Sequence, residues 1–259
     1  MKKYLKMMIA VLVVAFAVSA CTHEKSNLPE DAVQINGGSY ILPGDYPEDL
    51  WQDPAAHKAG NGVYVASAGD ELVVYEKTYT VLGETPRTQC YPTFEGGGLL
   101  GSKDGLSLNN GEMIVDEPCV SLLVSYSEEH ALAVTTTNDM TSVHVLSLNA
   151  GIWCADNVIT IEGVCGLIFY EWPNLTYAPG QDMYVLTSKT MVKIEVGDFL
   201  DDTGRLDETS VFEYDVPAYW PYLSPNSMIM LKDSKIYIGD RFGILAIDQN
   251  GVFTYYHVK

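Results

Sequence analysis

The stretch Ser234-Lys-Ile-Tyr-Ile-Gly-Asp-Arg-Phe-Gly-Ile-Leu-Ala-Ile-Asp248 decides how the rest of the chain is interpreted. Its two apolar runs, 236–239 and 244–247, are short and are separated by a polar segment that contains Gly243. Short apolar runs bounded by turn residues are typical of β-strands. The stretch therefore predicts a β-hairpin.

Similar hairpins are predicted earlier in the chain, at 62–75, 182–196 and, in a looser form, 130–148. Tyr64, Leu132, Tyr184 and Tyr237 hold the same place in the four units, and their separations are 68, 52 and 53 residues. A repeat of about fifty residues built from hairpins indicates a radial or solenoid array. The gap of 68 residues leaves room for an extra unit.

Composition narrows the class of protein. The chain has 259 residues, of which 47% are hydrophobic and 19% charged, and it contains 17 tyrosines. These values indicate a globular protein rich in strands, and no stretch after residue 60 has a sustained helical period. The net charge of −19 argues against nucleic acid and against electrostatic docking on anionic lipid. We interpret the acidity as favouring solubility, with an acidic recognition surface as the alternative.

Residues 1–20 are typical of a targeting segment, with Lys2, Lys3 and Lys6 before an apolar run at 7–18 that is too short to span a membrane. The following Val18-Ser-Ala-Cys21 resembles the lipobox of bacterial lipoproteins. The alternative is an ordinary secretory signal followed by an incidental cysteine.

The lipobox resemblance implies cleavage before Cys21, whose thiol would then carry diacylglycerol and be labelled by palmitate. Without the three lysines of the signal peptide, the net charge of −19 becomes −22. Residues 21–31 are predicted to be a flexible tether and 32–259 a single domain. The resemblance places the protein in the bacterial cell envelope, anchored by lipid, at the outer membrane on its periplasmic or surface face.

Four further cysteines, Cys90, Cys119, Cys154 and Cys165, form an even set that is compatible with disulfides in an exported chain. We considered Cys154 with Cys165, as neighbours on adjacent strands, and Cys90 with Cys119. Four buried free thiols are the alternative.

Catalytic signatures are scarce in the sequence, which contains no G-x-S-x-G, H-E-x-x-H or Walker motif. His130 and His144 fall on two strands of one predicted hairpin and would approach a metal only together with a third ligand. We therefore predict no metal, no cofactor and no catalytic residue, and we favour a protein that is not an enzyme.

Two aromatic segments that contain proline, 169–177 and 216–225, are the candidate binding surfaces. Rigid Tyr and Trp side chains bury a large area at a small entropic cost, so interfaces and sugar sites use them. The alternative is that they fill gaps between sheets. The predicted binding residues are Trp172, Tyr219, Trp220 and Tyr222.

The repeated hairpins resemble the blades of β-propellers, and the spacing implies about five blades, with a two-sheet β-sandwich as the alternative. A closed ring leaves few free sheet edges. The resemblance also implies that strands near 32–42 complete a sheet with 251–258.

For function, we expect a lipid-anchored binding or scaffold protein that presents its loops to a protein partner in the envelope. The alternatives are a glycan- or lactone-acting propeller enzyme and an acidic immunity or inhibitor lipoprotein.

Overall fold

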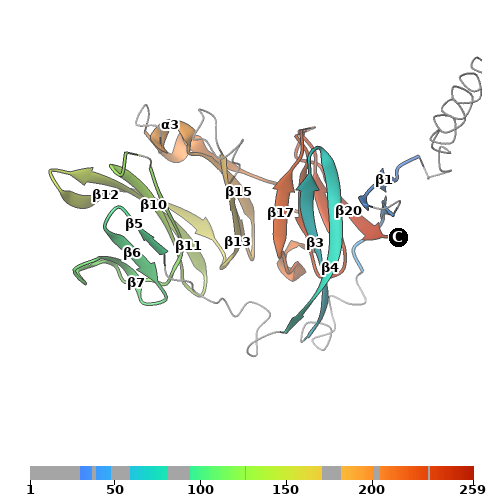
Figure 1. The fold of residues 1–259 in the computed structure, drawn as a ribbon, viewed down its shortest axis with the longest axis horizontal. Coiled ribbons are helices and arrows are strands. Elements are labelled where there is room, and N and C mark those ends of the chain that lie inside the picture. The colour runs from blue at the N-terminus through green and yellow to red at the C-terminus, as the bar shows by residue number, and fades with distance from the viewer. Residues whose placement is uncertain are drawn as a thin grey trace, which may run out of the picture.

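The computed structural model describes residues 30–36, 39–47, 59–80, 94–125, 127–170, 182–200, 205–232 and 234–259. The predicted signal peptide and most of the predicted tether lie outside these residues. The described chain is all-β, as predicted, and its strands form five small antiparallel sheets (Figure 1). The helical elements are α3 (Gly197–Leu200) and the 3-10 turns η3 (Glu208–Ser210) and η4 (Trp220–Tyr222).

Three of the sheets have four strands each, and one has two. The two-stranded sheet contains β3 (Ala59–Ala68) and β4 (Glu71–Thr80). The next contains β5 (Phe94–Gly96), β6 (Leu99–Ser102), β7 (Gly105–Leu108) and β8 (Met113–Val115). It is followed by β9 (Cys119–Val124), β10 (His130–Thr136), β11 (Met140–Asn149) and β12 (Ile152–Glu162). The last of the three contains β13 (Cys165–Tyr170), β14 (Asp182–Thr187), β15 (Met191–Glu195) and β16 (Val211–Glu213).

The fifth sheet is built from both ends of the chain. It contains β1 (Val33–Gln34), β2 (Tyr40–Pro43), β17 (Ser227–Met230), β18 (Ile236–Gly239), β19 (Ile244–Ile247) and β20 (Phe253–Val258), in the order β1-β2-β20-β19-β18-β17. Ile41 on β2 lies opposite Val258 on β20, and the Lys259 amide donates a hydrogen bond to the Tyr40 carbonyl at 2.9 Å. The predicted joining of the two ends in one sheet is confirmed.

The repeated hairpins occupy different sheets, as predicted. Leu132, Tyr184 and Tyr237 lie on β10, β14 and β18, while Tyr64 lies on β3. The strands β10 and β14 are the second of their sheets in chain order, and β18 is the second of the four C-terminal strands of the terminal sheet. Leu132, Tyr184 and Tyr237 are all buried. The long gap between Tyr64 and Leu132 is filled by the β5–β8 sheet, a unit that the tyrosine pattern misses.

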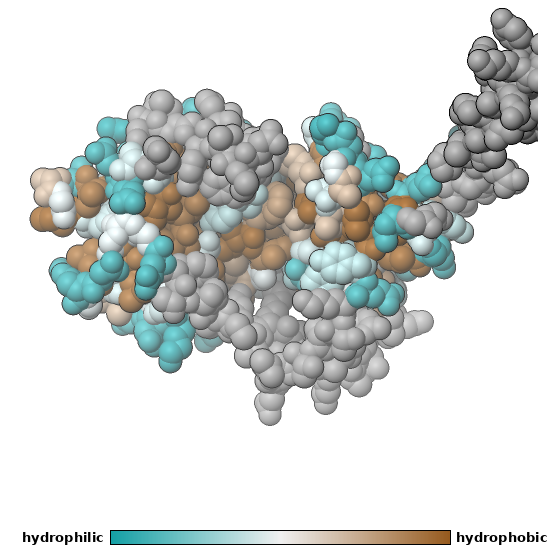
Figure 2. Space-filling view, in the orientation of Figure 1, coloured by the Kyte–Doolittle hydropathy of each residue, from teal (hydrophilic) through white to brown (hydrophobic). Residues whose placement is uncertain are grey.

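The sheets pack face to face through four hydrophobic clusters. One lies between the β5–β8 and β9–β12 sheets, the next between β9–β12 and β13–β16, and the third between β13–β16 and the terminal sheet. The fourth joins the terminal sheet to β3–β4. Figure 2 shows hydrophobic residues along the sheets in the middle of the view and hydrophilic residues at the strand ends. Because there are five sheets rather than two, the β-sandwich alternative is wrong.

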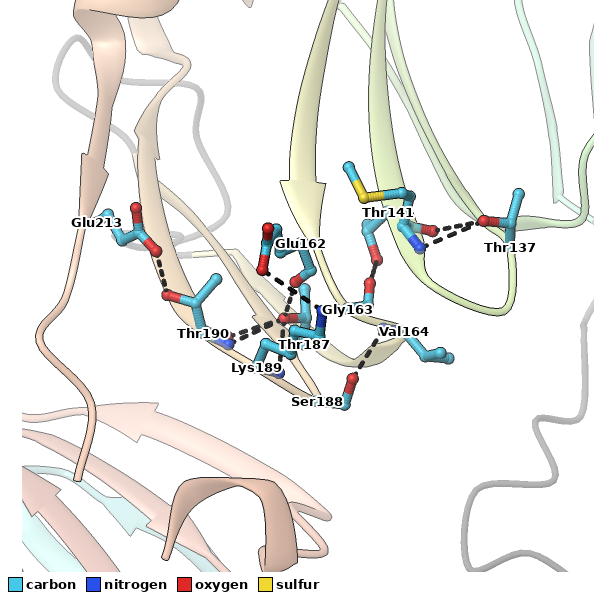
Figure 3. Close-up of polar contacts among 11 residues, drawn as sticks. Thr137, Thr141, Glu162, Gly163, Val164, Thr187, Ser188, Lys189, Thr190 and Glu213 are labelled. Atoms are coloured by element: carbon cyan, nitrogen blue, oxygen red, sulfur yellow. Dashed lines mark hydrogen bonds and ion pairs between the residues drawn. The ribbon is translucent and has the colours of Figure 1, made fainter. Parts of the chain in front are cut away.

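The connection from β12 to β13, which joins two sheets, is held by the turn between β14 and β15 (Figure 3). The Thr187 hydroxyl donates to the Glu162 carbonyl at 2.5 Å, and the Val164 amide donates to the Ser188 hydroxyl at 3.0 Å. Gly163 has a φ of +94°, and a Cβ there would lie 2.7 Å from the Ser188 hydroxyl. Only glycine therefore fits the tight turn from β12 to β13.

Related hydrogen bonds join other pairs of neighbouring sheets. The Cys165 amide donates to the Thr136 hydroxyl at 3.1 Å, where β10 ends. The Trp220 indole donates to the Thr187 carbonyl at 3.0 Å, where β14 ends. The Val63 amide donates to the Asp240 carbonyl at 2.9 Å, just after β18. In each case, a residue at or just after the end of β10, β14 or β18 is hydrogen-bonded to a segment that belongs to the next sheet or leads into it.

The described cysteines take part in neither of the disulfides considered from the sequence. Cys119, Cys154 and Cys165 are free, and Cys90 lies outside the described residues. Cys154 and Cys165 do not form a disulfide because they lie at opposite ends of β12. Cys154 is near the start of this extended strand, about 26 Å from Glu162 at its end, and Cys165 follows Glu162 closely. Cys119 is buried, and this burial raises the pKa of its thiol to about 11.

Candidate functional site

An open aromatic pocket of about 970 Å³ lies beside the sheet that joins the two chain ends. Its walls come from the end of β2 with the following loop, from the segment before η4, and from β20. The lining residues are Asp31, Pro43, Gly44, Asp45, Tyr46, Ala218, Tyr219, Phe253, Thr254 and Tyr255. The pairing of β2 with β20 brings these distant segments together.

Three tyrosines give the pocket a rigid aromatic wall. The rings of Tyr46 and Tyr219 are stacked, with centroids 4.7 Å apart and planes 5° apart. Tyr255 meets the Tyr46 ring edge-on at 5.1 Å and the Tyr219 ring at 6.1 Å. Such offset and edge-to-face contacts are the arrangements that aromatic rings prefer. Tyr46 and Tyr255 are buried, and Tyr219 is partly exposed, so Tyr219 offers ring surface to a ligand.

Asp240 supports this wall from inside the protein and is fully buried. Its carboxylate accepts hydrogen bonds from the Ser224 amide at 2.6 Å, the Phe242 amide at 3.4 Å and the Tyr255 hydroxyl at 3.5 Å. Burial raises the pKa of Asp240, and the backbone hydrogen bonds oppose that shift in part. Asp240 therefore fixes the loop and ring positions but has no exposed surface with which to touch a ligand.

The tyrosines of the wall remain neutral phenols in the physiological pH range. Burial raises the pKa of Tyr219 to about 12, and the nearby Asp240 carboxylate adds to the effect. Burial followed by Asp240 also raises the pKa values of Tyr46 and Tyr255. The Tyr46 hydroxyl donates a hydrogen bond to the Tyr222 carbonyl at 3.3 Å, which ties the loop after β2 to η4. The three tyrosine rings of the wall are thus uncharged, and hydrogen bonds and ring packing hold them in place.

Two acidic side chains, Asp31 and Asp45, lie exposed at the rim of the aromatic pocket. The Asp45 carbonyl lies 3.0 Å from His257 Nε2, so its loop is attached to β20. A neutral aromatic wall beneath an acidic rim favours a cationic or amphipathic group, because cations are attracted to ring faces and to carboxylates.

Replacing Asp240 with Asn should change how stability depends on pH. The folded protein raises the pKa of Asp240 and therefore binds its proton more tightly than the unfolded chain. This contribution to the free energy of unfolding is present at low pH and falls as pH rises above the unfolded pKa, by up to about 1.4 kcal/mol per pH unit. Urea titrations from pH 4 to pH 8 should show that Asp240→Asn gains stability relative to wild type as pH rises. Parallel profiles would contradict this account of Asp240.

The predicted aromatic residues have different environments. Tyr219 is in the pocket wall, Tyr222 is 42% exposed beside it, and Trp220 is buried at 2% exposure. Trp220 packs in the core between the β13–β16 sheet and the terminal sheet, which is the gap-filling role considered as the alternative. Trp172 lies outside the described residues.

The two histidines are not brought together. The strands β10 and β11 pair, but His130 lies opposite Ser147 and His144 lies opposite Ala133. Positions 144 and 147 are an odd number of residues apart, so the two imidazoles lie on opposite faces of the sheet. His144 Nε2 is 2.9 Å from the Thr135 hydroxyl, and burial lowers the pKa of His144. Among the described residues, no group of three His, Cys, Asp or Glu side chains is placed to hold a metal ion.

Sequence reasoning missed Tyr46, Asp240 and Tyr255. Tyr46 lies in an acidic, proline-containing segment that reads as a solvated loop, and Asp240 lies in a hairpin turn, where aspartate is usually exposed. The sequence did contain one indication for Tyr255, because this residue falls in the strand predicted to close the terminal sheet. The segments that contact it come from other parts of the chain, and the sequence does not reveal them.

Comparisons with known proteins give a limited result. No family model matches the chain, and no curated protein matches it. Among solved structures, it is similar to a protein from Lactobacillus plantarum, with a TM-score of 0.37 and 15% identity, over 77% of this chain and 65% of that chain. It is also similar to a catalytically inactive virginiamycin B lyase from Staphylococcus aureus with quinupristin, with a TM-score of 0.30 and 9% identity, over 84% of this chain and 73% of that chain. The chain thus spans slightly less than two thirds of the first protein.

Within the described residues, none of the helices has the length and hydropathy that crossing a membrane requires.

Proposed function

We propose that this protein is a lipid-anchored binding protein of the bacterial cell envelope, and that its aromatic pocket receives a basic segment of a partner protein. The observation that carries the proposal is the stacked pair Tyr46 and Tyr219 in an open pocket with an acidic rim. Rigid tyrosines lose little conformational entropy on binding and present both apolar area and hydroxyl groups, so they serve protein interfaces well.

Charge favours a basic partner over a neutral or acidic one. The chain has a net charge of −19, and Asp31 and Asp45 stand at the rim of the pocket. A positively charged segment would be attracted to the protein at a distance, which raises the association rate more than the final affinity. Lys or Arg side chains would then lie over the neutral face of Tyr219.

The pocket favours binding over catalysis. A group that acts on a substrate must lie within hydrogen-bonding distance of the reacting atom. Asp240, whose pKa is raised, is fully buried behind the tyrosines. Its carboxylate is occupied by the Ser224 and Phe242 amides and the Tyr255 hydroxyl. These contacts stabilise the pocket and leave Asp240 without access to a bound molecule.

The five sheets are proposed to be the blades of a β-propeller. Three observations support this: hydrogen bonds link successive sheets at related positions, each described sheet packs on a neighbour in chain order, and the terminal sheet uses both chain ends. The terminal sheet also packs on β3–β4, as a ring requires. Ring closure then needs only one further interface, between the β3–β4 and β5–β8 sheets.

The distance from the lipid anchor limits where the partner lies. Asp31 at the pocket rim is ten residues after Cys21. Ten residues span at most about 35 Å when fully extended. If Cys21 carries the lipid, the pocket remains close to the membrane surface, and we expect the partner to be a membrane-associated protein.

Site-specific crosslinking in living cells tests the proposal. A photo-reactive amino acid at Ala218, an exposed residue of the pocket, is expected to give a crosslinked adduct with one envelope protein. Adding Tyr219→Ala should remove most of that adduct, because it deletes the exposed ring of the wall. The same photo-reactive group at Thr160, an exposed position on β12, is the matched control and should not form the adduct.

Mass spectrometry of the adduct then tests the charge argument. The crosslinked peptide of the partner should be rich in Lys and Arg, and the yield in isolated envelopes should fall as salt is raised. An adduct that persists in Tyr219→Ala, or that forms equally from Thr160, would show that the aromatic pocket is not the binding site.

A further inference from the structure

A second pocket, of about 780 Å³, lies in a different part of the molecule and is lined by several polar residues together with apolar ones such as Leu148 and Phe199. It is formed where β10 starts and β11 ends, together with the first half of β12. The ring of Phe199 on α3 lies 4.8 Å from the ring of His130, and α3 is seen at this end of the sheet in Figure 1. We call this the polar pocket.

The polar pocket interrupts an apolar sheet face. His130 and Ser147 lie directly opposite each other on β10 and β11. The same face continues with Leu132 and Val145, which are buried in the core against the β13–β16 sheet. Ser147 is 9% exposed. Polar groups at an otherwise apolar face cost stability unless they are hydrogen-bonded, so His130 and Ser147 need polar partners at this end of the sheet.

A β-bulge brings a carboxylate to these two residues. In the pairing of β11 with β12, Val145 lies opposite Asn157 and Leu146 lies opposite Ala155, which leaves Asp156 as the extra residue. The Ser147 hydroxyl donates to Asp156 Oδ2, and His130 Nδ1 lies 3.0 Å from Ser147 Oγ. Since the hydroxyl proton goes to Asp156, the hydrogen-bond network assigns His130 Nδ1–H as the donor to Oγ. Bulges often re-aim a side chain beside a functional site.

The order of these contacts argues against a serine hydrolase. In a catalytic triad, the imidazole lies between the serine and the carboxylate and removes the hydroxyl proton. Here Ser147 lies between His130 and Asp156, so its oxygen accepts from the imidazole and its proton is held by the carboxylate. The arrangement orients polar groups and does not activate a nucleophile.

The charged residues that line the polar pocket restrict the chemical class of its ligand. The carboxylates of Glu129, Asp156 and Asp207 outnumber the single guanidinium of Arg205, which disfavours an anion. Side chains that both donate and accept, Asn149 and Asn157, complete the polar lining. Sugar hydroxyls match this mixture because each one donates to a carboxylate or amide oxygen and accepts from an N–H group.

From this geometry we infer that the polar pocket binds a neutral saccharide. The volume of about 780 Å³ is in the range of ligand pockets for small molecules and leaves room for a short oligosaccharide. The inference does not rest on the aromatic pocket or on a protein partner, so either proposal can fail without the other.

The test uses the full chain in detergent on an array of neutral oligosaccharides, followed by calorimetry with each compound that binds. Wild type is expected to bind at least one oligosaccharide saturably. Asp156→Ala and Asn149→Ala should each weaken that binding about tenfold or more, since each removes hydrogen bonds to the ligand. The matched control is Thr160→Ala, on the same strand but outside the polar pocket, which should bind as wild type does.

Asn149 is exposed at the end of β11, so its replacement leaves the fold intact even if Asp156→Ala weakens the bulge. The inference is overturned if no oligosaccharide binds at millimolar concentration, or if binding is unchanged in both pocket variants. Saturable binding of tetralysine that is lost in both variants would also overturn it, because the pocket would then recognise cations.

Discussion

Removal of Val252–Lys259 is expected to abolish cooperative unfolding. The deletion takes away β20, which pairs with β19 on one side and with β2 on the other. It also removes Tyr255, which is 3% exposed and belongs to the core between the β13–β16 sheet and the terminal sheet. Loss of one buried aromatic side chain costs about 3–5 kcal/mol, and a domain has only about 5–15 kcal/mol in total. The loss of a central strand exceeds that margin.

Thermal and urea denaturation followed by near-UV circular dichroism measure this effect. The truncated chain should show no sharp transition, whereas wild type shows one. Val252→Ala is the matched control: Val252 is 56% exposed, and its replacement should change the free energy of unfolding by less than about 0.5 kcal/mol. A truncated chain that melts cooperatively at the wild-type temperature would mean that β20 is dispensable.

Replacing Cys21 with Ser is expected to remove the lipid anchor completely. Cys21 lies outside the described residues, and the prediction rests on the lipobox-like sequence at 18–21. In bacterial lipoproteins the lipid is attached through a thioether, which a serine hydroxyl does not form. Two or more acyl chains hold a protein stably at a membrane, and without them an acidic protein of net charge −19 has no electrostatic attraction to anionic lipid.

Metabolic labelling with a palmitate analogue, together with membrane fractionation, measures this second effect. Wild type should be labelled and sediment with membranes, and Cys21→Ser should be unlabelled and lose its acyl-mediated attachment. Cys154→Ser is the control, since Cys154 is an exposed thiol far along the chain. Equal labelling of wild type and Cys21→Ser would end the lipoprotein hypothesis.

The fold class was predictable because local patterns determine it. The hairpins around Tyr184 and Tyr237 carry their strand pattern and turn residues within about fifteen residues of sequence. The joining of the chain ends was also predictable, since 252–258 forms a strand pattern that needs a partner. The β5–β8 sheet escaped the tyrosine pattern because its strands have only three or four residues, with no aromatic residue on β6.

The candidate sites were much less predictable, because contacts between distant segments create them. The stack of Tyr46 on Tyr219 joins residues far apart in the chain, and neither residue has a local signal that specifies the other. Asp156 contacts Ser147 at a β-bulge, where β12 carries an extra residue. The position of such an extra residue is not visible in the alternation of the sequence, so the register on the two sides of the bulge is not predictable from it.

The terminal sheet imposes an order on folding. The β9–β12 and β13–β16 sheets each use consecutive strands, so their contacts are available soon after synthesis. The strand β2 can pair with β1 at once, but its other edge is paired only by β20. The β3–β4 hairpin likewise forms locally, but the terminal-sheet strands on which it packs are synthesised much later. The first strands to be synthesised thus pair locally but complete their packing last. During that interval the apolar side chains of Val63 and Val65 are exposed, and a chaperone that shields them from aggregation would act at this stage.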